Sequence, residues 1–119
     1  MTDHKAQIQQ AIQASIDVLS AAKAGPEKEW LVLDTEQAQS AIAAIDQAVQ
    51  STGELSRKTK TTQGLQTFAA MAYGILVYTE STISILDNGT SESHQGRTVT
   101  ALEQLKRVLS IIDEAFAVN

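Results

Sequence analysis

The sequence predicts an all-α fold: an antiparallel up-down four-helix bundle with a short irregular segment between the first and second helices. In four separate stretches of the 119-residue chain, apolar residues recur at helical spacing. Glycine-containing or polar segments separate these stretches, and neither strand-like alternation nor a long internal repeat is visible. With 43% apolar and 19% charged residues, the chain is long enough to bury one core, so we expect a single helical-bundle domain over residues 1–119.

The first helix is expected over residues 3–24, because Thr2 or Asp3 can cap its free N–H groups and Gly25-Pro26 is a strong stop signal. The following stretch, 26–34, contains an apolar run of four residues without helical spacing. It either begins the second helix or forms an extended lid over the bundle. We favour the lid, because Asp34 begins a new capping pattern.

The second helix is expected over residues 35–51, ending at Gly53. Alanines recur on its apolar side, which indicates close approach to a neighbouring helix. The segment that follows carries three basic residues, Arg57, Lys58 and Lys60, and is expected to be an exposed connection. It has no aromatic residue for stacking on nucleic-acid bases.

The third helix, expected over residues 62–87 and ending before Gly89, is the most apolar part of the chain. Glu80 is its one charged residue before Asp87, at its end. Its central apolar run is shorter than the roughly 20 residues that a membrane span requires. Ala70 and Gly74 form a small-residue notch where another backbone can come close. A helix that is apolar on more than one side must be covered on more than one side.

The fourth helix is expected over residues 98–118, with Thr100 as a candidate cap, and has the most regular amphipathic pattern. Together with the surplus apolar surface of the third helix, this pattern predicts a homodimer, or a larger oligomer, joined through these two helices. The expected interface residues are Met71, Tyr78, Ile85, Val108 and Ile111.

A small-molecule site is the alternative interpretation of the aromatic residues. Tyr73 and Glu80 are spaced to lie on one side of the third helix, and a carboxylate among aromatic rings can receive a cationic or hydroxylated ligand. In this interpretation the ligand-binding residues are Trp30, Tyr73, Tyr78 and Glu80.

The sequence offers no assembled catalytic or metal site. His4 and His94 fall in a terminus and a polar loop, where we expect solvated side chains, and neither has a partner at metal-ligand spacing. Asp113 and Glu114 are adjacent rather than one turn apart, so a metal-dependent nucleotide hydrolase would need carboxylates from separate helices. The absence of cysteine excludes thiolate ligands and a cysteine nucleophile. We therefore predict no catalytic residue, no metal and no cofactor.

The formal charge of −5 weighs against nucleic acid as a partner. We also expect no membrane partner. The absence of a visible secretory signal and of cysteines fits a cytoplasmic location. The leading functional prediction is a small acidic helical interaction module (an adaptor, inhibitor or immunity-type factor) that is not catalytic and associates with itself.

Overall fold

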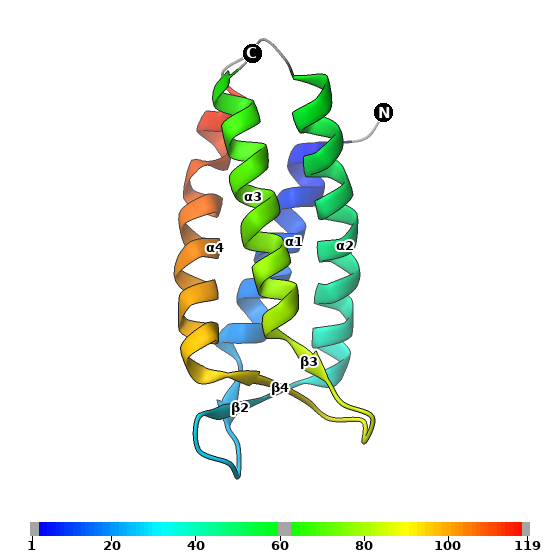
Figure 1. The fold of residues 1–119 in the computed structure, drawn as a ribbon, viewed down its shortest axis with the longest axis vertical. Coiled ribbons are helices and arrows are strands. Elements are labelled where there is room, and N and C mark those ends of the chain that lie inside the picture. Colours follow the sequence, from blue (N-terminus) through cyan, green and yellow to red (C-terminus); the bar gives the residue numbers. More distant parts are fainter. Residues whose placement is uncertain (1–2, 60–62, 118–119) are drawn as a thin grey trace.

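The computed structural model describes residues 3–59 and 63–117, and 74% of these residues are helical. Over these residues the elements include the helices α1 (His4–Ser20), α2 (Thr35–Lys58), α3 (Gln63–Thr82) and α4 (Gln95–Phe116). The helices lie side by side, and each runs opposite to the one before it (Figure 1). The molecule is elongated along the helix direction, with extents of 50 × 24 × 16 Å.

A small antiparallel sheet closes one end of the bundle (Figure 1), and it corrects the prediction of an all-α fold. Within the described residues it has four strands, in the order β1-β2-β4-β3. Their bounds are β1 Lys23–Ala24, β2 Trp30–Leu33, β3 Ser84–Ile85 and β4 Ser91–His94. The strands β1 and β2 form a hairpin between α1 and α2, while β3 and β4 form a hairpin between α3 and α4. The central pair, β2 with β4, joins the two hairpins.

The strand β2 lies within residues 26–34, the stretch for which the sequence allows either an extended lid or the start of the second helix. It is extended, as the lid interpretation required, but it is a paired strand rather than a loose cover. Leu33 faces the bundle and is 4% exposed, whereas Val32 points the other way and is 44% exposed. An apolar run of four residues without helical spacing is thus the pattern of a short strand whose faces alternate.

The strand β4 has the polar sequence Ser-Glu-Ser-His, and its serines face inward. Ser91 and Ser93 are almost fully buried. The Ser91 hydroxyl donates to the Thr35 hydroxyl at 3.0 Å, and the Thr98 hydroxyl donates to that of Ser93 at 2.7 Å. Because buried hydroxyls need partners, these bonds allow a polar strand to lie against the apolar helices.

The helices α1 and α3 end earlier than predicted, at Ser20 and Thr82, because the next residues form the outer strands of the sheet. Lys23 and Ala24 pair with β2, and Ser84 and Ile85 pair with β4. Gly89 was expected to cap a helix. It instead lies in the turn between β3 and β4 with φ of 82°, where Asn-Gly is a strong hairpin signal.

The helix α2 extends past its predicted end before Gly53, and the helix α4 begins before its predicted start at residue 98. Helix α2 continues through Gly53 because Leu55, 7% exposed, extends its buried stripe by another turn. Helix α4 begins at Gln95, and the Thr100 hydroxyl donates to a backbone carbonyl inside the helix rather than capping it. The predictions also included Thr2, Lys60, Thr62 and Val118, which lie outside the described residues.

The core lies along the axis of the bundle and receives residues from every helix. The alanines of α2 that were expected to allow close approach, Ala38, Ala41 and Ala48, are fully buried. At the end opposite the sheet, the rings of Phe68 and Phe116 pack edge to face with centroids 5.8 Å apart, which joins α3 to α4.

The chain contains a structural repeat that its sequence does not show. Each half is a helix, a β-hairpin and a helix, and the strand order reads the same when β1 and β2 are exchanged with β3 and β4. The buried positions of α2 and α4 correspond in order, as Ala38 with Thr98, Ala41 with Ala101, Ile45 with Leu105, Ala48 with Val108, and Thr52 with Ile112. Three of these five pairs differ in size and two of those also differ in polarity, so the pattern of burial is repeated more closely than the sequence.

His94 joins the sheet to α4, and its replacement tests this junction. Its Nδ1 accepts the backbone N–H of Gly96 at 3.2 Å, and its ring packs edge to face on Trp30, with centroids 5.5 Å apart. We expect His94→Ala to lower the free energy of unfolding by about 1–2 kcal/mol in urea titrations at neutral pH. His94→Asn, which keeps a capping acceptor, should cost less. Equal losses in the two variants would show that the cap contributes nothing.

Candidate functional site

The outward face of α3 differs from the outward faces of the other helices because it carries no charge. Glu80, the one charged residue of α3, lies at the side of the helix next to α2. Tyr73 and Val77 on this face are 48% and 42% exposed. We call this surface the α3 face; its exposed members are Gly64, Thr67, Ala70, Tyr73, Gly74, Val77 and Ser81. An exposed apolar surface of this kind is typical of a contact site for another molecule.

The groove between α3 and α4 borders the α3 face and is hollowed at two levels. Far from the sheet, a hollow of about 420 Å³ is lined by residues that include Thr67, Met71, Ile111 and Glu114. Nearer the sheet, a hollow of about 300 Å³ lies beside Gly74 and Tyr78. The groove therefore offers room for side chains of a partner helix, which is a common mode of helix recognition.

Opposite charges lie at the two ends of this groove. At the sheet end, the Arg97 guanidinium lies 5.1 Å from the centroid of the Tyr78 ring and donates to the Ser81 hydroxyl at 2.9 Å. At the other end, Glu114 lines the hollow that Thr67 also lines. Between these ends the groove is lined largely by apolar and uncharged polar side chains.

The predicted interface residues divide into those on this groove and those away from it. Met71, Tyr78 and Ile111 are half-buried against the core and line the hollows. Ile85, 38% exposed, lies on β3 instead of on α3. Val108 is fully buried among core residues of its own chain, so this part of the prediction is wrong. The wide apolar stripe of α4 is covered largely by the other helices.

The predicted ligand-binding residues are not brought into one pocket. Trp30 lies in the sheet, beside a hollow of about 350 Å³ between the two hairpins. Tyr78 faces the groove toward α4, Tyr73 is exposed on α3, and Glu80 faces Asp46 of α2. The four residues thus point to different parts of the surface.

Glu80 and Asp46 form a carboxyl pair between α3 and α2. Burial raises the pKa of the Glu80 carboxyl above its usual value, and a hydrogen bond to Asp46 and the negative charge of Asp46 raise it further. A raised pKa means that the folded state disfavours ionised Glu80. The pair is therefore a small cost to stability at neutral pH.

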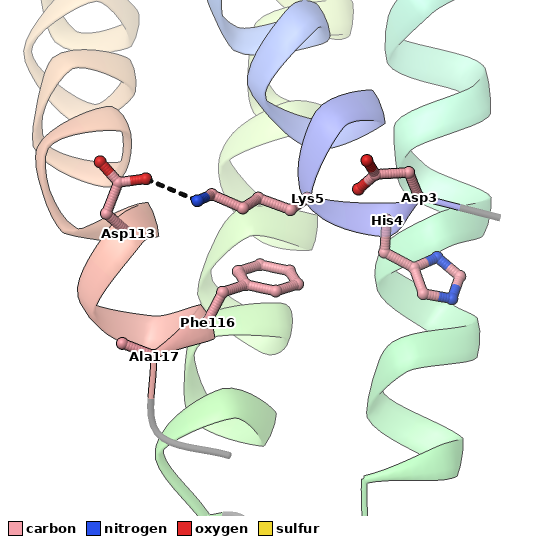
Figure 2. Close-up of a pocket in the computed structure, with 6 residues that line it drawn as sticks. All are labelled: Asp3, His4, Lys5, Asp113, Phe116 and Ala117. Atoms are coloured by element: carbon pink, nitrogen blue, oxygen red, sulfur yellow. Dashed lines mark ion pairs between the residues drawn. The ribbon is translucent and has the colours of Figure 1, made fainter.

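The end opposite the sheet has a hollow of about 490 Å³ between the start of α1 and the end of α4. Figure 2 shows Lys5 reaching across it to Asp113, with Nζ and Oδ1 2.8 Å apart, above the ring of Phe116. The neighbouring His4 points away from this ion pair, toward α2 (Figure 2). The exposure of the two charged partners makes their ion pair a weak contributor to stability.

The two histidines are less solvated than the sequence suggested. The His4 side chain is 15% exposed, and its Nδ1 is buried without a hydrogen-bond partner among the described residues. His94 caps α4 and packs on Trp30, as described above. Over residues 3–59 and 63–117, no group of three or more histidine or acidic side chains is placed to hold a metal ion.

Comparison with known proteins gives no relative: no family model, no curated protein and no solved structure matches the chain. In the part of the chain that the structure describes, no helix is both long and apolar enough to cross a membrane. Any function must therefore be argued from the surface itself.

The sequence indicates Gly74 as part of a small-residue notch but does not point to Arg97 and Glu114, because only folding places these two charges on the same groove.

Packing within the chain does not require a glycine at position 74. A Cβ built at this position meets no other atom within 4 Å, and the residue lies in the middle of α3. We expect Gly74→Ala to raise the free energy of unfolding by about 1 kcal/mol, the usual helix-propensity difference. The measurement is a urea titration at a concentration where the chain is monomeric. A loss of stability would show that the alanine methyl group is not accommodated in the folded chain.

Asp46→Asn tests the carboxyl pair through pH. Because the pKa of Glu80 is raised in the folded state, the cost is fully present above that pKa and absent below the unfolded value, near 4.5. We expect Asp46→Asn to stabilise the protein at pH 7 by roughly 0.5 kcal/mol, the scale of exposed charge pairs. The gain should vanish in unfolding measurements at acidic pH, where the Glu80 carboxyl is protonated. An equal gain at both pH values would argue against the charge explanation.

Proposed function

We propose that this protein is a non-catalytic interaction module that associates with itself through the α3 face and the adjoining groove. The observation that carries the proposal is the combination of an uncharged helix face with exposed Tyr73 and Val77. The faces that α2 and α4 turn to solvent carry charged residues such as Glu36, Glu103 and Lys106. A contact site is expected where an apolar surface interrupts such a charged surround.

The energetic argument favours burial of this face in a complex. Removing apolar surface from water contributes about 25 cal/mol per Å² before the entropic cost of association is subtracted. Tyr73 presents a large ring at low conformational cost, and aromatic residues are enriched at protein interfaces. Half-buried Met71 adds an adaptable side chain in the neighbouring hollow. The roles suggested by the sequence, an adaptor, an inhibitor or an immunity-type factor, all use such a surface.

The proposal is tested by the molar mass of the protein in solution. Light scattering on the eluting protein at micromolar concentration should give the mass of a dimer or a larger oligomer. We expect the double variant Tyr73→Lys, Val77→Lys to shift the mass toward the monomer. Both side chains are well exposed, and two lysines would have to lose their hydration in the complex.

A matched control places the same charges on α2. Ala43→Lys with Gln47→Lys uses two exposed positions at the same spacing and should leave the molar mass unchanged. Circular dichroism should show equal helix content in both double variants. A wild-type chain that is monomeric across the micromolar range would overturn the proposal, and so would a dimer that tolerates the lysines on α3.

A further inference from the structure

We infer that the partner on the α3 face is a second copy of this chain, packed antiparallel, with the two-fold axis passing beside Gly74. The inference rests on the proposed self-association and adds its geometry. A two-fold interface uses the same patch on both chains, so the patch must be complementary to itself. The α3 face meets this requirement in shape and, together with the groove, in charge.

Shape complementarity follows from the positions around Gly74. When two α3 helices cross antiparallel there, residues at equal distances before and after Gly74 come opposite one another. Ala70 then meets the partner's Tyr78. A small side chain thus faces a large one on each side of the axis, which is how packed helix surfaces interlock.

Gly74 fits the crossing point of such a pair. Helix axes in packed pairs lie about 8–10 Å apart, and the smaller distances require small residues at the contact. A Cβ at Gly74 meets nothing within 4 Å in its own chain, although glycine in a helix is unfavourable relative to alanine. Close approach of a second backbone accounts for this residue, whereas the isolated chain does not.

The charges decide the direction of the second copy. Arg97 is bonded to Ser81, which follows Gly74 by two turns, and Glu114 lines the hollow beside Thr67, which precedes Gly74 by the same interval. An antiparallel pair therefore brings Arg97 near the partner's Glu114, and the two-fold axis repeats this pairing. A parallel pair would instead place Arg97 at the same end as the partner's Arg97, and Glu114 at the same end as the partner's Glu114. Like charges would then repel at both ends. Complementary charges of this kind select the orientation of a complex.

Charge reversal tests the orientation. In Arg97→Glu, glutamate would face the partner's Glu114, and in Glu114→Arg, arginine would face the partner's Arg97. We expect each variant alone to dimerise at least about tenfold more weakly than the wild type. An equimolar mixture of the two should form a heterodimer, because both contacts then join opposite charges. Sedimentation velocity with one variant fluorescently labelled measures the exchange.

The outcomes separate this inference from the proposed function. If the wild type is a dimer and the mixture does not form heterodimers, the antiparallel arrangement is wrong while self-association stands. If the wild type is a monomer, both fail. Because Arg97→Glu also removes the contacts with Tyr78 and Ser81, its helix content and melting temperature are compared with those of the wild type.

Disulfide trapping provides a second test, in which both charged residues, Arg97 and Glu114, are kept. The chain has no cysteine, so single introduced thiols report unambiguously. Facing Cα atoms in closely packed helices lie within the range that a disulfide can bridge. We expect Thr67→Cys mixed with Ser81→Cys to give a disulfide-linked heterodimer on oxidation, whereas each variant alone should give little linked dimer. Ala43→Cys on α2 is the control. Efficient self-linkage of Thr67→Cys would indicate a parallel pair and overturn the inference.

Discussion

The pairing of β2 with β4 is the contact on which the arrangement of the two halves depends. Its register sets Trp30 opposite His94 and Leu33 opposite Ser91, which are residues far apart in the chain. The helices α2 and α4 begin directly after these strands, so the pairing aligns the starts of both helices at one end of the bundle. The Asp34 carboxylate accepts from a backbone N–H of α2, while the His94 ring does the same for α4. One strand pair therefore sets the level at which the second helix of each half begins.

This arrangement also explains how the α3 face comes to be exposed. In the bundle α3 lies between α2 and α4 and diagonally across from α1 (Figure 1). Its buried stripe, with Phe68 and Leu76 fully or almost fully covered, faces the axis. A helix with neighbours on two sides and a core on the third still turns one side outward. In α3 that side contains Tyr73 and Val77 instead of charged residues, which leaves apolar surface that no described element covers.

Much of the fold was predictable because helical periodicity is a local property. The stripe that contains Ile45 and Ala48 in α2, and the stripe that contains Leu105 in α4, are buried as their spacing indicated. The hairpin between α3 and α4 also had a signal, because Asn88-Gly89 is a strong turn pair. The same pair also fits the end of a helix, because glycine is common both in turns and after helices, and spacing alone does not distinguish the two.

The rest was not predictable, for reasons that involve distant residues. Ser-Glu-Ser-His has no strand tendency of its own, and it becomes β4 because the other hairpin offers it a partner. The groove was predicted only in part. Met71 and Tyr78 belong to a visible stripe, but Arg97 and Glu114 are ordinary surface charges until α4 is set beside α3. Val108 was misplaced because a wide apolar stripe does not show which of its residues face the core.

The amino-acid sequence alone therefore accounts for the helices, for the side that each helix buries and for the unusual lack of charge on α3. These properties depend on residues three and four positions apart, which any helix brings together. Tertiary structure decides the strands, the ends of the helices and the charges at the ends of the groove. These depend on backbone groups and side chains that meet only when the two halves of the chain pack together.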